Sequence, residues 1–122
     1  MNSEYIITPH ELALKGLNLS DYAYDETFIP AIIGNGLSLT ISRSCKLGDL
    51  KSSKQLENYI ASDSEDRTSE EKIEAFKEAQ YRMIYNLLFM NETNPNDDYV
   101  DDVLVYELGF KINGFQKGLF RR

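Results

Sequence analysis

The strongest structural signal in the chain lies in residues 68–90, which read TSEEKIEAFKEAQYRMIYNLLFM. Thr68 and Glu71 have the spacing of a capping box, in which each side chain accepts a hydrogen bond from the other residue's backbone. Behind this start, apolar side chains recur at steps of three and four residues, the period of one helical face. The stretch therefore predicts a long amphipathic helix that ends near residue 91. Its apolar positions are Ile73, Phe76, Met83, Ile84, Leu87 and Leu88.

A short helix is predicted directly after residue 8. Thr8 can cap it, Pro9 suits the first helical position, and Glu11 completes another capping box. Gly16 is a suitable end, since glycine readily adopts the left-handed conformation that terminates helices.

Another helix is predicted to open at Asp25 or Thr27 and to continue toward Ile41. Gly34 and Gly36 fall inside it, and each glycine in a helix interior costs about 1 kcal/mol relative to alanine. The two glycines therefore indicate either a break in the helix or a place where another segment approaches the backbone closely.

Two further helices complete the expected body, one near residues 49–61 and one from about Val100 to Gly109, with an exposed loop over 62–69. The end of the chain has a different pattern, because Phe110-Lys111-Ile112 alternates as a strand does and Asn113-Gly114 favours a hairpin turn. We therefore expect a mainly α fold. It comprises a small bundle of four to five helices in residues 1–108 and a C-terminal β-hairpin or extended arm in residues 109–122.

Composition excludes several classes of function. The 122 residues carry a net charge of −7, so nucleic acid or an anionic membrane is repelled rather than attracted by the chain as a whole. A single cysteine, Cys45, and a single histidine, His10, exclude an internal disulfide and every metal site built from several such ligands. No apolar run approaches a membrane span and the first residues lack a secretory signal. We expect a protein made in the cytoplasm, with no membrane contact and no cofactor.

The densest acidic cluster occupies residues 97–102, where aspartates four positions apart would share a helical face. Such carboxylates can hold Mg²⁺ or Ca²⁺, although negative side chains at a helix start are also explained by the helix dipole. His10 is expected on the surface and Cys45 as a packing residue, so no catalytic pair emerges. We expect no enzymatic activity, and a metal-dependent hydrolase remains the third alternative. The aspartates are Asp97, Asp98, Asp101 and Asp102.

Charge changes sign abruptly near the C-terminus. Residues 91–108 hold six acids and no base, whereas residues 109–122 hold four bases and no acid. Five large apolar side chains in the same tail exceed what a small hairpin can bury on itself. The arm either folds back on its acidic neighbour or docks on another chain, and we favour docking. The predicted docking residues are Phe110, Ile112, Phe115, Leu119, Phe120, Arg121 and Arg122, with the four aspartates as an acidic counterpart facing the next subunit or a channel.

Four segments resemble the head-tail connector, or adaptor, proteins of tailed bacteriophages: IITPHELALKGLNL, DETFIPAI, FKEAQYRMIYNLLFM and ELGFKINGFQKGLFRR. The resemblance implies a small, mainly helical structural protein of the virion neck. It also implies a homo-oligomeric ring, often of twelve copies, that binds the portal protein and further neck or tail proteins. DNA would pass through the ring without specific binding. From another class, the leading alternative is a small acidic inhibitor or regulator that mimics DNA.

Overall fold

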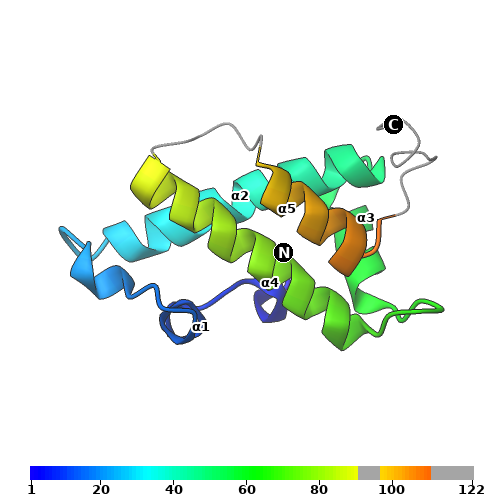
Figure 1. The fold of residues 1–122 in the computed structure, drawn as a ribbon, viewed down its shortest axis with the longest axis horizontal. Coiled ribbons are helices and arrows are strands. Elements are labelled where there is room, and N and C mark those ends of the chain that lie inside the picture. The colour runs from blue at the N-terminus through cyan, green and yellow to red at the C-terminus, as the bar shows by residue number, and fades with distance from the viewer. Residues whose placement is uncertain (91–96, 111–122) are drawn as a thin grey trace.

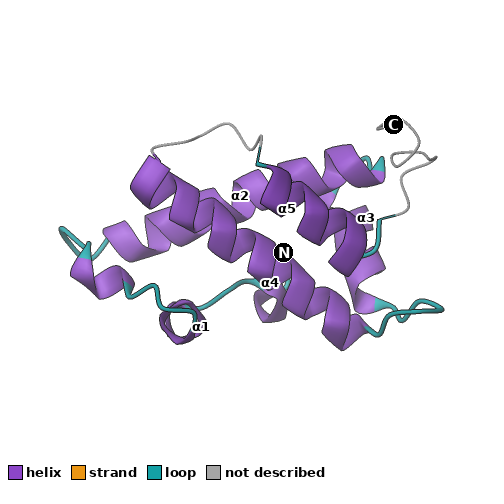
Figure 2. Cartoon of the chain, in the orientation of Figure 1, coloured by secondary structure: helices purple, strands orange, loops and turns teal. Residues whose placement is uncertain are grey.

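The structure, a computed structural model, describes residues 1–90 and 97–110 (Figure 1). This part of the chain is helical and contains no strand (Figure 2), which confirms the mainly α class. Short 3₁₀ turns, η1 (Ser3–Tyr5) and η2 (Leu19–Asp21), flank the first helix, and π-helical turns, η3 (Asn86–Met90) and η4 (Val103–Glu107), extend the last two. The α-helices are α1 (Pro9–Leu14), α2 (Phe28–Gly48), α3 (Ser53–Ala61), α4 (Ser69–Tyr85) and α5 (Asp98–Asp102).

Both predicted capping boxes are present. At α4, the Thr68 hydroxyl accepts from the Glu71 amide at 3.1 Å and the Glu71 carboxylate accepts from the Thr68 amide at 2.9 Å. At α1, Thr8 and Glu11 make the same reciprocal pair at 3.1 and 2.9 Å. These local bonds satisfy helix-start donors that would otherwise lack partners, so the starts of both helices follow from a few neighbouring residues.

Helix α4 is the centre of the bundle. It packs against α2 and α3, and the unit formed by α5 and η4 lies beside it (Figure 1). Buried Gln80 also ties the N-terminal segment to α4: its amide accepts from the Ile7 N–H at 3.1 Å and donates to the Tyr5 carbonyl at 2.7 Å. A buried polar group is tolerated because both of its ends are paired.

Helix α2 runs unbroken through Gly34 and Gly36, so the close approach is confirmed and the break does not occur. A Cβ atom on Gly36 would lie 2.5 Å from Ile84 Cγ1 of α4, whereas one on Gly34 would meet nothing within 4 Å. Small residues recur at every fourth position along α2, at Gly36, Thr40, Ser44 and Gly48. Gly36 lets Ile84 of α4 lie close against α2, and Gly48 leaves room for the Phe110 ring.

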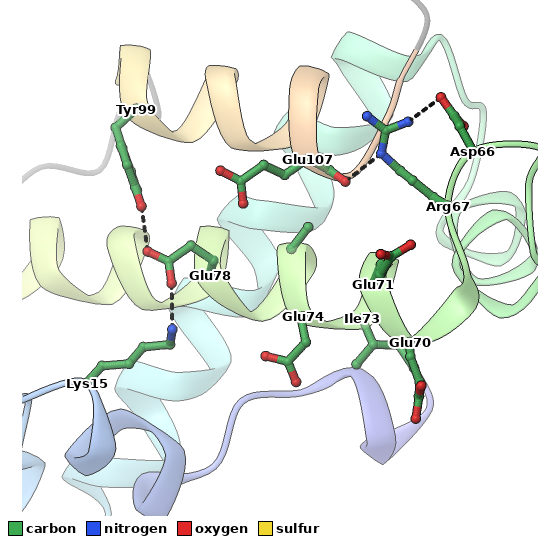
Figure 3. Close-up of a pocket in the computed structure, with 11 residues that line it drawn as sticks. Lys15, Asp66, Arg67, Glu70, Glu71, Ile73, Glu74, Glu78, Tyr99 and Glu107 are labelled. Carbon is green, nitrogen blue, oxygen red and sulfur yellow. Dashed lines mark hydrogen bonds and ion pairs between the residues drawn. The ribbon is translucent and has the colours of Figure 1, made fainter.

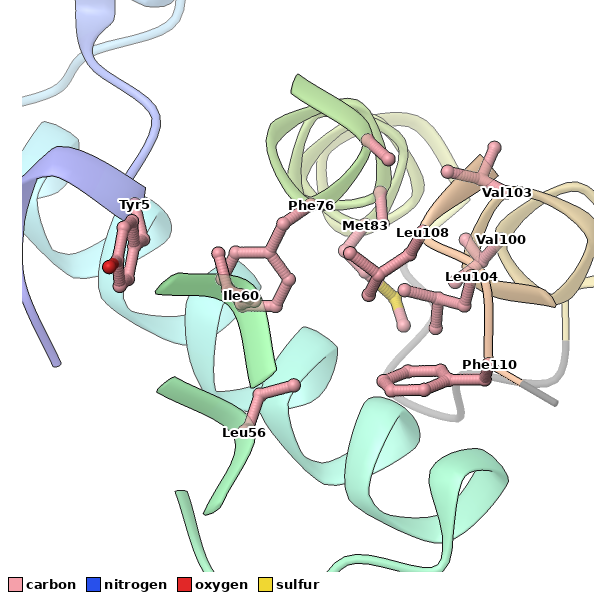
Figure 4. Close-up of a cluster of buried hydrophobic side chains, with 12 residues drawn as sticks. Tyr5, Leu56, Ile60, Phe76, Met83, Val100, Val103, Leu104, Leu108 and Phe110 are labelled. Carbon is pink, nitrogen blue, oxygen red and sulfur yellow. The ribbon is translucent and has the colours of Figure 1, made fainter. Parts of the chain in front are cut away.

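The buried side chains form two clusters. The larger one joins α3, α4 and the α5–η4 unit around Phe76, Leu104 and Leu108 (Figure 4). The second joins α1, η2, the first half of α2 and Ile84. None of the helices in the described ranges is long and apolar enough to span a membrane.

Phe110 belongs to the larger cluster and is only 6% exposed (Figure 4). Its ring lies over Gly48, where an added Cβ would come within 2.8 Å, and its centroid is 5.2 Å from that of Tyr59. This corrects the expectation that Phe110 docks on another chain: the missing side chain at Gly48 leaves room for it in its own body. The predicted hairpin and the other docking residues lie outside the described residues. They are Ile112, Phe115, Leu119, Phe120, Arg121 and Arg122.

Candidate functional site

The four aspartates do not form one acidic face. The Asp97 carboxylate accepts from Arg82 Nε at 3.0 Å and Asn86 Nδ2 at 2.6 Å, and it also caps α5 through the Tyr99 amide. Asp101 accepts two hydrogen bonds from the guanidinium of Arg43, at 2.7 and 2.6 Å. These two carboxylates are therefore paired with arginines of their own subunit, and their assignment to an interface or channel stays a prediction. Asp98 and Asp102 remain exposed on α5.

A cation site at these aspartates has little support, because arginine already occupies two of the four carboxylates. Across residues 1–90 and 97–110, no group of three or more histidine, cysteine, aspartate or glutamate side chains is placed to hold a metal ion. His10 is exposed in the first turn of α1, as predicted. Cys45 packs at the edge of the larger cluster, where burial raises the pKa of its thiol, and the prediction of a packing residue is confirmed.

The paired carboxylates make stability depend on pH. Burial disfavours ionised Asp97, but the hydrogen bonds from Asn86 and Arg82 outweigh it and hold its pKa below the usual value. A carboxylate with a lowered folded-state pKa stabilises the fold above its unfolded pKa of about 4, and this contribution is lost as the pH falls through the folded value.

We therefore expect Asp97→Asn to lower the free energy of unfolding by about 2 kcal/mol at pH 7, because charged hydrogen bonds of this kind are worth roughly 1.5–3 kcal/mol. At pH 3 the difference from the native chain should shrink. Urea unfolding at both pH values measures it, with Asp98→Asn, an exposed neighbour, as the control. An equal loss at both pH values would contradict this account.

An open groove of about 820 Å³ runs along α4, between the end of α1 and the α5–η4 unit (Figure 3). Six carboxylates and two bases line it, so it carries surplus negative charge. At one end Glu78 accepts from Lys15 Nζ at 2.5 Å and from the Tyr99 hydroxyl at 2.6 Å. This hydrogen bond to a carboxylate raises the pKa of Tyr99 to about 12. The charged lining residues are Lys15, Asp66, Arg67, Glu70, Glu71, Glu74, Glu78 and Glu107.

The second base of the groove, Arg67, is used to hold the last helix. Its guanidinium contacts the Asp66 carboxylate at 3.0 Å, and it donates to the backbone carbonyls of Glu107 at 2.9 Å and Tyr106 at 2.5 Å. Both bases are thus engaged, while the Glu70 and Glu74 side chains are exposed along the opening. The groove suits a basic partner. Glu70, Glu74 and Glu78 are four residues apart, a spacing that could have indicated this face from the sequence.

The point where the C-terminal tail leaves the body is firmly held. The Tyr59 hydroxyl donates toward the carbonyls of Leu108 at 2.9 Å and Gly109 at 3.1 Å. Gly109 has a φ of +93°, a conformation that glycine adopts without strain. Lys72, fully buried, donates to two carbonyls at the end of α3 and lies 3.8 Å from the Tyr59 ring centroid. The exit of the tail is therefore a fixed position beside the end of α2.

A second surface feature lies at the opposite end of the bundle, and we call it the aromatic end. Tyr24 is 90% exposed and Met90 59%, and the Phe89 ring packs edge-on to Tyr22 at 5.4 Å and against Tyr85 at 4.8 Å. Sequence patterns do not reveal this surface, because its rings come from two distant segments, residues 22–28 and 85–90, that only the fold brings together. The aromatic end consists of Tyr22, Tyr24, Phe28, Tyr85, Phe89 and Met90.

Comparison with protein-family models, curated proteins and solved structures finds no match to this chain.

Proposed function

We propose that the chain is a non-enzymatic structural protein, the subunit of a head-tail connector ring in a phage neck. The observation that carries the proposal is the division of charge. Residues 1–110 contain twenty acids and nine bases, a net charge of −11, whereas residues 111–122 contain four bases and no acid. A head-to-tail ring needs two different, complementary patches on every subunit, and an acidic body with a basic tail supplies such a pair.

Apolar residues in the tail support docking rather than simple charge neutralisation. Ile112, Phe115, Leu119 and Phe120 are four large apolar side chains in twelve residues. Phe110 is excluded from the docking set, because it fills the core of its own subunit. In the proposal the four remaining apolar residues anchor the tail on a neighbouring subunit or the portal. Arg121 and Arg122 pair with carboxylates there, since arginine is favoured in such contacts.

The net charge also suits the proposed place in the virion. A ring of acidic subunits presents a channel wall that repels phosphate weakly, so DNA can slide through without being held. Exposed Asp98 and Asp102 are the members of the aspartate cluster that can still face such a channel. The portal protein would lie on one side of the ring and further neck or tail proteins on the other.

The direct experiment mixes the purified full-length chain with an assembled portal ring of a tailed phage and measures co-sedimentation. We expect binding by the native chain and its loss in the double variant Arg121→Glu with Arg122→Glu. Exposed Lys51 and Lys54 on the body provide the matched control, because Lys51→Glu with Lys54→Glu makes the same change of charge away from the tail. A native chain that neither assembles nor binds any portal tested would refute the proposal.

The acidic groove favours a second candidate, the inhibitor or regulator that mimics DNA. Its surplus carboxylates along α4 present negative charge that a basic, nucleic-acid-binding enzyme can recognise. If the chain mimics DNA, it should be a monomer or dimer that binds a basic protein. Duplex DNA should displace it from that protein, and Glu70→Gln with Glu74→Gln should weaken the binding. A connector subunit should show neither effect, so the two proposals predict opposite results in one competition experiment.

A further inference from the structure

We propose that the aromatic end of one subunit receives residues 111–122 of a second copy. The inference rests on the proposed ring and assigns the surface through which neighbouring subunits join. It follows from three observations: an apolar surface at one end of the bundle, a tail whose chemistry matches it, and the distance between that surface and the tail of the same chain.

The aromatic end is exposed on the described body. Tyr24, Met90 and Phe89 are 90%, 59% and 46% exposed, and such grouped aromatic side chains are typical anchors of protein interfaces. The segment that follows Met90 reads NETNPN and contains no large apolar residue. It therefore cannot supply the apolar cover that these rings would gain from a partner.

Charge around the aromatic end complements the tail. The loop 21–27 reads DYAYDET, so Asp21 on one side and Asp25 and Glu26 on the other flank the two exposed tyrosines. The tail combines four large apolar residues with four bases, and its aromatic rings and arginines can stack on tyrosine faces while the bases meet the carboxylates. Arg82 already shows this contact within the chain, with its guanidinium 5.2 Å from the centroid of the Tyr85 ring.

The acidic groove is a poorer receptor for the same tail. Its charge is suitable, but Ile73 and Ala75 are the only aliphatic residues of its lining. Four large apolar side chains placed there would remain largely in contact with water, and their burial is the main source of affinity in such contacts.

Geometry favours the tail of another copy over the chain's own tail. The tail leaves the body at Phe110, which lies on Gly48 at the end of α2, whereas Phe28 begins the same helix at the aromatic end (Figure 1). The 21 residues of α2 span roughly 30 Å at 1.5 Å per residue. Fully extended chain covers about 3.5 Å per residue, so Phe115 reaches about 17 Å beyond Phe110, and Phe120, ten residues on, reaches about 35 Å only when fully stretched. The chain's own tail therefore cannot bring Ile112 and Phe115 to the aromatic end, and only a completely straight tail would bring Phe120 there. A neighbouring subunit placed end to end meets no such limit, and repetition of this contact builds a ring or filament.

Complementation between two full-length variants tests the assignment. Tyr24→Ser with Phe89→Ser removes the receptor, and Phe115→Ser with Phe120→Ser removes the tail anchors. We expect each variant alone to self-associate at least about tenfold more weakly than the native chain, because buried aromatic anchors dominate interface affinity. Mixed together, they should stop at a one-to-one heterodimer, which retains one intact tail and one intact receptor. Tyr106→Ser, at an exposed tyrosine of η4 distant from the aromatic end, should leave assembly unchanged.

Site-specific cross-linking then locates the tail. In a Cys45→Ser background, a chain with Phe120→Cys should form an intermolecular disulfide with Tyr24→Cys but not with Glu74→Cys in the groove. Assembly that survives Tyr24→Ser with Phe89→Ser, or linkage to Glu74→Cys instead, would overturn the aromatic-end assignment and leave the connector proposal standing. A native chain that remains monomeric with and without a portal ring would overturn both.

Discussion

Replacement of Phe110 by alanine is expected to lower the free energy of unfolding by about 3–5 kcal/mol, the usual loss for a buried phenylalanine. The residue lies in a tail that reads as exposed from the sequence, yet its ring fills the space over Gly48 and stacks near Tyr59. Urea unfolding of the native and variant chains, monitored by circular dichroism, measures the loss.

Tyr106→Ala provides the control for this result. It removes an aromatic side chain of similar size from a position that is 61% exposed and lies outside the aromatic end, so its effect should stay below about 1 kcal/mol. Equal losses from the two variants would show that Phe110 does not belong to the core.

Burial of Phe110 also decides which truncations the body tolerates. Deletion of residues 109–122 should destabilise the body, whereas deletion of residues 111–122 should not.

The second large effect is expected at Gly36. A leucine there must displace Ile84 of α4, since even a Cβ atom would lie 2.5 Å from Ile84 Cγ1. Overpacking of this kind costs about 3 kcal/mol at the upper end of its usual range. Gly34→Leu makes the same change two residues earlier on an exposed face, where we expect a gain of about 0.5 kcal/mol from helix propensity.

Thermal or urea unfolding of these two glycine variants distinguishes local from tertiary effects. If both lost stability equally, the cost at Gly36 would come from the helix itself rather than from the contact between α2 and α4. Opposite signs at positions two residues apart are the expected result.

The helices could be predicted because their signals are local. The capping boxes at Thr8 and Thr68 act within three residues, and the apolar period of α4 is visible in one stretch of sequence. Burial of Phe110 could not be predicted in this way. It depends on Gly48, which is 62 positions away in the sequence, and the local alternation of Phe110-Lys111-Ile112 indicates a strand instead.

The candidate site was predicted less well, because its groups come from separate segments. Asp101 finds Arg43 on α2, 58 positions earlier, so its spacing within the acidic cluster does not reveal its partner. The acidic groove needs Glu78 of α4 beside Lys15, the residue that follows α1, a pairing that only the folded chain creates. The tail residues beyond Phe110 remain predictions, and the proposed function depends on them.

The mass of the assembly in solution tests the central claim most directly. Analytical ultracentrifugation would compare the full-length chain with a chain that ends at Phe110, which keeps every described member of the core. We predict that the full-length chain forms rings or larger oligomers, alone or on a portal ring, and that the shortened chain is a monomer of unchanged unfolding stability. Equal masses for two folded chains under both conditions would contradict the claim that the basic, apolar tail joins one subunit to the next.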